Sequence, residues 1–156
     1  GNKGEPTEKN LYNDASKTIE WLNSKGVKNK DIVLYGESLG TGVVVELAQH
    51  GNYNGIILES PFTSMEDAAK NIYPWLPVKY LLKDKYDSKA KIKKIKIPIL
   101  IMHGKKDRIV PFRMGKRLYD LANEPKFSFF TDNDDHMMEF NEKLLKSIED
   151  FSGVDS

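Results

Sequence analysis

The stretch "VLYGESLGTGVVVELAQH", Val33 to His50, changes within a few residues from a strand-like to a helix-like pattern. The apolar run "DIVLYG", residues 31–36, is typical of a buried strand, and "GVVVELAQH", residues 42–50, indicates an apolar helix stopped by Gly51. Between them, Ser38 has one glycine two residues before it and another two residues after it. A serine in this position is either an ordinary helix cap or a nucleophile presented by a sharp turn.

The same alternation of strands and helices continues outward from this stretch. Further predicted strands are "GIILES" (55–60), "IPILIMHG" (97–104) and "KFSFFT" (126–131). Predicted helices are 14–25, ending before Gly26, then 113–122, and a closing helix marked by Phe140, Leu144, Ile148 and Phe151. Short apolar strands separated by helices favour a parallel sheet covered on both faces. We therefore predict an α/β fold with about four strands and one domain over residues 1–156.

Two segments stand outside this pattern. Residues 61–96 are irregular, with short helices predicted at 65–73 and 78–82, and have the character of a cap-like insertion. The opening run "GNKGEPTEKN", residues 1–10, is polar, contains Gly and Pro and lacks an initial Met. We expect a loop there, entered from a segment further upstream.

Composition excludes several classes of function. Lys and Arg number 24 against 23 Asp and Glu, so the net charge of +1 gives no indication of a nucleic-acid partner. The absence of cysteine excludes disulfides and thiolate metal sites. No apolar run reaches the roughly 18 residues of a membrane span, and the first residues do not form a signal peptide. We expect a soluble, cytoplasmic protein without integral membrane contact, and "GESLGTG" lacks the spacing of a dinucleotide site.

A nucleophilic serine needs a base to take its proton and an acid to orient that base. His136 lies in "DNDDHMMEF", after the last predicted strand and before the closing helix. Asp107 lies in the polar turn after the third strand. With Ser38 they follow the chain order Ser, Asp, His that hydrolases built on such sheets use.

The other candidates for these roles have simpler interpretations. His50 ends the predicted nucleophile helix and suits its negative dipole end, and His103 is interpreted as a packed structural histidine. The aspartates near His136, which are Asp132, Asp134 and Asp135, remain alternatives for the acid. They are too close in sequence to orient the imidazole as well, and a solvated loop explains them. No second cluster of ligands supports a metal site.

Four stretches together resemble the α/β-hydrolases, in particular the serine esterase and acyl-thioesterase branch: "YGESLGTGVV", "ESPFTS", "KIKIPILIMHGKKDRIVPF" and "DDHMMEF". The resemblance implies Ser38 as nucleophile, Asp107 as acid and His136 as base, with the Leu39 N–H as one oxyanion donor and no cofactor or metal. Two departures accompany it. Asp135 stands where the family usually has Gly, and the family's first four strands and second oxyanion donor have no counterpart, which indicates a truncated core.

These expectations define a function and its rival. The first is a serine carboxylic-ester hydrolase that acts through an acyl-enzyme on small, short-chain or activated esters. The second is a catalytically weak or inactive remnant that serves as a binding or assembly module. Tyr73, Trp75 and Leu76 lie where such enzymes carry a cap over the acyl pocket, although packing of a short helix explains them equally well.

Two surface features concern partners. Eight lysines between Lys79 and Lys96 either face anionic lipid or, more simply, form a solvated face. The strand "IVLY", Ile32 to Tyr35, would become an unprotected sheet edge if the family's neighbouring strand is missing. We therefore expect a homodimer or larger homo-oligomer that buries this edge, with a different protein as the lesser alternative.

Overall fold

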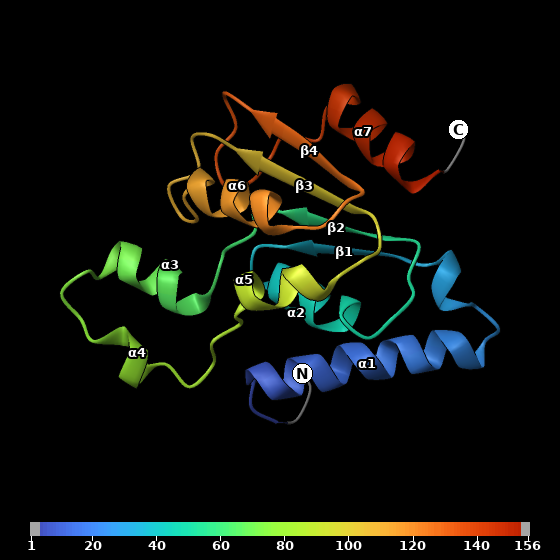
Figure 1. Cartoon of the computed structure of the whole chain (residues 1–156), viewed down its shortest axis with the longest axis horizontal. Coiled ribbons are helices and arrows are strands. Elements are labelled where there is room, and N and C mark those ends of the chain that lie inside the picture. Colours follow the sequence, from blue (N-terminus) through green and yellow to red (C-terminus); the bar gives the residue numbers. More distant parts are fainter. Residues whose placement is uncertain (1–3, 154–156) are drawn as a thin grey trace.

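The computed structural model describes residues 4–153, which form one parallel sheet flanked by helices (Figure 1). The strands are β1 (Val33–Glu37), β2 (Gly55–Glu59), β3 (Ile99–Gly104) and β4 (Lys126–Thr131), in the spatial order β1-β2-β3-β4. All three pairings are parallel. Each of the four predicted strands is present and the predicted α/β class is confirmed.

The helices fill the connections between these strands. They are α1 (Glu8–Ser24), α2 (Leu39–Ala48), α3 (Met65–Ile72), α4 (Val78–Leu81), α5 (Ser88–Lys91), α6 (Phe112–Leu121) and α7 (Glu142–Ser152), with short 3-10 turns η1 (Asn29–Asp31) and η2 (Ile92–Lys94). Because these connections make all four strands run in the same direction, the C-terminal ends of the strands lie together along one end of the sheet. Residues that follow β1, β2, β3 and β4 therefore gather there.

Helices cover both faces of the sheet, as the apolar strands predict. On one face α2, α6 and η2 pack on side chains such as Leu58 and Ile101, and α1 lies against α2. On the other face α7 packs its Leu144 against Ile57 and Leu100, and Figure 1 shows it alone on that side. Helices on both faces leave β2 and β3 buried along their whole length, and their residues are apolar except for Glu59 and His103 near the strand ends.

The predicted loop at residues 1–10 is wrong for residues 8–10, because α1 begins at Glu8 rather than Asp14. The Thr7 hydroxyl caps the helix by accepting from the Asn10 N–H at 3.3 Å. The extra turn is held by tertiary contacts: the Glu8 N–H donates to Asp84 Oδ1 at 2.9 Å, and Tyr12 packs edge-on against Tyr86. Residues 1–3 lie outside the described residues.

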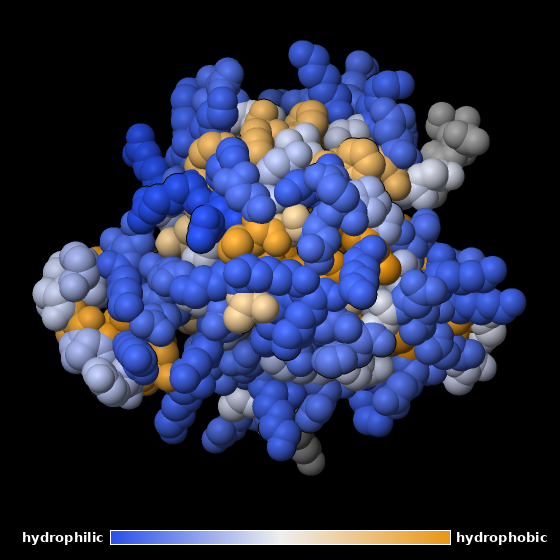
Figure 2. Space-filling model, viewed as in Figure 1, coloured by the Kyte–Doolittle hydropathy of each residue, from blue (hydrophilic) through white to orange (hydrophobic). Residues whose placement is uncertain are grey.

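Residues 61–96 divide into two parts. Phe62, Tyr86, Ile92 and Ile95 near the two ends are buried in the core. The middle, with α3 and α4, extends beyond the C-terminal ends of the strands (Figure 1). Figure 2 shows strongly hydrophobic residues beside residues of intermediate hydropathy on the surface of this part, and Trp75 and Tyr80 are 74% and 84% exposed.

Two lysines of the basic run pair with carboxylates of this chain. Lys91 Nζ lies 2.7 Å from Glu46 Oε2 and 3.5 Å from Glu8 Oε1, and Lys89 Nζ lies 2.7 Å from Asp67 Oδ2. These lysines therefore tie α5 to α1, α2 and α3. Among residues 4–153, no helix combines the length and apolar character needed to cross a membrane.

Candidate active site

Ser38 occupies the turn between β1 and α2 and adopts an unusual backbone conformation. Its φ is 48° and its ψ is −116°, a region that residues with a side chain rarely enter. Although Ser38 is at the cap position of α2, its hydroxyl makes no capping hydrogen bond. The backbone is held instead by the Ser38 N–H, which donates to the Glu59 carbonyl at 2.9 Å. An ordinary helix cap is therefore the wrong interpretation of this serine.

The two glycines that flank Ser38 have different roles. A Cβ on Gly36 would lie 2.7 Å from the carbonyl carbon and oxygen of Gly40, so α2 could not pass this close to β1 with any other residue there. A Cβ on Gly40 would have no atom within 4 Å apart from its chain neighbours and the backbone of α2 itself. The backbone of Gly40 is therefore closely approached by β1, while the space beside its own Cα is open.

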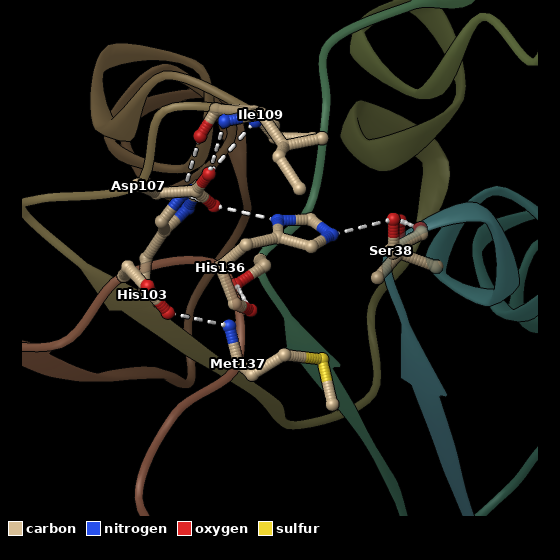
Figure 3. A network of polar contacts seen from close by, with 10 residues as sticks. Ser38, His103, Asp107, Ile109, His136 and Met137 are labelled. Carbon is tan, nitrogen blue, oxygen red and sulfur yellow. Dashed lines mark hydrogen bonds and ion pairs between the residues drawn. The ribbon is translucent and has the colours of Figure 1, made fainter.

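Ser38, His136 and Asp107 form a continuous line of hydrogen bonds (Figure 3). Ser38 Oγ lies 3.0 Å from His136 Nε2, and His136 Nδ1 lies 2.8 Å from Asp107 Oδ2. The three residues come from the turns after β1, β4 and β3, which the parallel sheet brings together at the C-terminal ends of its strands. The serine is 98 residues from the histidine in sequence, so this contact depends on the complete fold.

The Asp107 carboxylate is fully buried and accepts hydrogen bonds at both oxygens. Oδ1 accepts from the backbone N–H groups of Ile109 and Val110, each at 2.8 Å. Oδ2 lies near the ring nitrogens of His136 and, at 3.1 Å, of His103. A buried carboxylate is costly unless such donors surround it, and this arrangement fixes its orientation.

The loop that carries His136 is attached to the sheet by its backbone. The Ser60 hydroxyl donates to the His136 carbonyl at 3.0 Å, and the Lys106 N–H donates to the Asp134 carbonyl at 3.0 Å. A Cβ on Gly104 would lie 2.2 Å from the Asp134 oxygen, so the loop passes directly over the end of β3. Asp135, in place of the family's usual glycine, accepts from the Met137 N–H at 3.2 Å.

The alternative candidates do not reach the histidine as Asp107 does. Asp132 pairs with Lys105 at 2.6 Å, and Asp134 accepts from the Thr131 hydroxyl at 2.8 Å. The lysine lowers the pKa of the Asp132 carboxyl. His50 is exposed and lies two residues beyond the end of α2.

Sequence reasoning missed a buried carboxyl beside this site. Glu59, at the end of β2, is 2% exposed and accepts a hydrogen bond from the Tyr35 hydroxyl. Burial raises the pKa of Glu59, while the Met138 backbone N–H and the nearby His136 ring oppose the shift. The signal was a charged residue at the end of the otherwise apolar "GIILES".

The surroundings of the serine and histidine are open. Leu39, the first residue of α2, is 41% exposed, and its N–H belongs to the first turn, where helix N–H groups have no partner within the helix. A cavity of about 380 Å³ beside His136 is lined by Lys106, Arg108, Ile109, Asn133 and Asp135.

The predicted acyl-contact residues lie in the protruding segment. Tyr73, Trp75 and Leu76 are 47%, 74% and 40% exposed, and the rings of Tyr73 and Trp75 pack edge-on with each other. Within residues 4–153, no group of three or more His, Asp or Glu side chains is arranged to hold a metal ion.

A sequence model of the phospholipase/carboxylesterase family matches residues 3–151. A protein of Mycobacterium tuberculosis is 41% identical over 127 residues, which cover 81% of this chain and 45% of that protein. The lysophosphatidylserine lipase of Danio rerio is 33% identical over 142 residues, which cover 80% of this chain and 37% of that protein. The chain thus spans less than half the length of these two relatives.

Solved structures give the same fold. The monoacylglycerol lipase of Paleococcus ferrophilus aligns with a TM-score of 0.70 and 19% identity, over 98% of this chain and 78% of that one. The acetyl xylan esterase of Paenibacillus sp. R4 aligns with a TM-score of 0.74 and 18% identity, over 92% of this chain and 51% of that one. With the family match over nearly its whole length, the chain belongs to the phospholipase/carboxylesterase family of α/β-hydrolases.

Proposed function

We propose that the chain hydrolyses carboxylic esters with Ser38 as nucleophile, His136 as general base and Asp107 as the acid that orients the base. The observation that carries this proposal is the hydrogen-bonded line from Ser38 Oγ to His136 Nε2 at 3.0 Å and from His136 Nδ1 to Asp107 Oδ2 at 2.8 Å. A hydroxyl at hydrogen-bond distance from an imidazole, itself held by a carboxylate, is the arrangement that makes serine nucleophilic.

The reaction proceeds in two halves. His136 takes the hydroxyl proton as Ser38 Oγ attacks the ester carbonyl, and it then gives that proton to the departing alkoxide, which leaves an acyl-enzyme on Ser38. Water, deprotonated by the same imidazole, attacks the acyl group; the acid is released and the proton returns to Ser38. The tetrahedral oxyanion is placed at the Leu39 N–H, at the positive end of the α2 dipole.

Activated, short-chain esters are the substrates expected to react fastest. Leu39 is the oxyanion donor identified among the described residues, and a site with one such donor in place of two is slower by about 10²- to 10³-fold in kcat. Esters with good leaving groups tolerate this loss better than amides do. We propose that the acyl chain contacts Tyr73, Trp75 and Leu76. Their segment extends beyond the C-terminal ends of the strands, where Ser38 lies.

The test is hydrolysis of p-nitrophenyl acetate and butyrate together with labelling by a fluorophosphonate probe, which reacts with an activated serine. Ser38→Ala and His136→Ala are each expected to abolish turnover and labelling. Asp107→Asn is expected to reduce kcat by about 10⁴-fold, because it removes the group that sets the tautomer of the base. Undiminished turnover in Ser38→Ala would exclude the serine mechanism, and a folded wild-type chain without labelling would favour the inactive binding module.

We also propose that the protein associates with itself through the outer edge of β1. Among residues 4–153, β1 pairs only with β2, so its other side presents unpaired backbone groups. Beside it lies an apolar groove of about 390 Å³, lined by Leu11, Ala15, Leu34, Val43 and other residues of α1 and α2. Two copies of a five-residue edge strand match each other in length across a two-fold axis.

A further inference from the structure

His103 is a second buried histidine that contacts the Asp107 carboxylate. It lies near the end of β3, its side chain is 0% exposed, and its ring packs edge-on against Phe112 of α6 with 5.8 Å between ring centroids. Figure 3 places it on the opposite side of Asp107 from His136. The sequence indicated only a packed structural histidine.

The hydrogen bonds of His103 determine which ring nitrogen carries the proton. Nε2 lies 3.1 Å from Asp107 Oδ2 and 2.9 Å from the Val110 carbonyl oxygen. Both oxygens can only accept when the carboxyl is ionised, so Nε2 must be the donor. The Nε2 hydrogen is therefore shared between Asp107 and Val110.

The surroundings of the other nitrogen, Nδ1, favour a neutral ring. Nδ1 is buried without a hydrogen-bond partner among the described residues, and a Cβ on Gly115 would lie 2.2 Å from it. A proton on Nδ1 would be a buried, unsatisfied donor on a charged ring. Burial accordingly lowers the pKa of His103, although Val110 and Asp107 oppose the shift.

We propose that His103 is a positioning residue, a neutral Nε2–H donor that holds Asp107 Oδ2 in place for the hydrogen bond to His136. The proposal rests on the Ser38, Asp107 and His136 mechanism but goes beyond it. With His103, the carboxylate has four donors, two backbone N–H groups at Oδ1 and two imidazoles at Oδ2. These fill its acceptor sites and leave it one orientation.

The donor also affects the base. The hydrogen bond from the His103 N–H stabilises part of the negative charge on Asp107 Oδ2. Without this bond, Asp107 would stabilise a protonated His136 more strongly. Four other charged groups lie near His136. They are Glu59 at the end of β2, Asp135 on the loop that carries His136, and Lys106 and Arg108, which line the cavity beside His136. From α6, Phe112 and Gly115 approach His103 and neither titrates. A change at His103 therefore reaches His136 through Asp107.

Nitrogen NMR of the wild-type protein tests the tautomer without any substitution. His103 is expected to carry its proton on Nε2, with a bare Nδ1, at alkaline and neutral pH and also at acidic pH values where an exposed histidine has already become protonated. A proton on Nδ1, or titration of His103 in step with an exposed histidine, would overturn the proposal. This measurement requires no catalytic activity.

A matched pair of variants tests the coupling to His136. His103→Gln can place an amide N–H near the former Nε2 position, whereas His103→Met has a similar shape and no donor. In His103→Met the NMR titration midpoint of His136 is expected to rise by about half a pH unit or more, and kcat/KM for p-nitrophenyl acetate to fall by about tenfold or more. His103→Gln is expected to restore both values most of the way.

The titration midpoint of His136 distinguishes a positioning role of His103 from a loss of stability. A smaller folded fraction lowers the rate but does not change the midpoint of the folded protein. An unchanged His136 midpoint in His103→Met, or no difference between the Met and Gln variants, would contradict the proposal. If His103→Met does not fold, the wild-type tautomer measurement still decides. A shifted midpoint in a protein that hydrolyses no ester would support the role of His103 and count against the proposed function.

Discussion

At the scale of single residues, Glu59 is a carboxyl whose burial raises its pKa. A raised pKa means that the folded state binds the proton more tightly than the unfolded state, so stability falls as pH rises from the ordinary glutamate value of 4.5 to the raised pKa of the folded protein. Glu59→Gln removes this charge but can still hydrogen-bond to Tyr35 and Met138. We expect its melting temperature to exceed that of the wild type at pH 8, and the difference to disappear near pH 4. An equal difference at both pH values would contradict this explanation.

At the scale of the elements, the crossing of β1 and α2 depends on Gly36. Its added Cβ would lie 2.7 Å from backbone atoms of Gly40 and 2.9 Å from the Thr41 nitrogen, none of which can move without displacing α2. We expect Gly36→Ala to destabilise the fold by about 2 kcal/mol or more in urea denaturation. Gly40→Ala is the matched control, because its Cβ enters open space within a helix, and we expect it to be neutral or stabilising by up to about 1 kcal/mol. Equal losses in both variants would show that the close approach is not limiting.

At the scale of the whole molecule, the side of β1 that has no pairing strand among residues 4–153 predicts self-association. Tyr35 on this strand is 41% exposed, and a lysine there places a charge at an edge that must be desolvated on pairing. We expect light scattering at micromolar concentration to give at least twice the mass of one chain, and Tyr35→Lys to weaken association by about tenfold or more. Tyr35→Phe controls for loss of the hydrogen bond to Glu59 and should associate as the wild type does. A folded, monomeric wild type would show that the self-association proposal is wrong.

The sequence by itself determined what depends on neighbouring residues. Apolar runs bounded by turns located all four strands, and periodicity located the longer helices, because burial on a sheet or helix face imposes a repeat that can be read locally. The serine between β1 and α2 and the order of Ser38, Asp107 and His136 were equally visible, since each follows a strand that ends at the same edge. The first turn of α1 was not, because Asp84 and Tyr86 stabilise it from about 75 residues away.

Only the tertiary structure decided which of these residues touch. Four aspartates were available to His136, and the fold selected Asp107, 29 residues away, because β3 and β4 lie side by side and bring their following turns together. The same packing placed His103 against the other side of that carboxylate and buried Glu59 beside Tyr35. Such contacts carry no local repeat: they arise when distant segments exclude water from the same volume, and each polar group left there must find its partner in three dimensions.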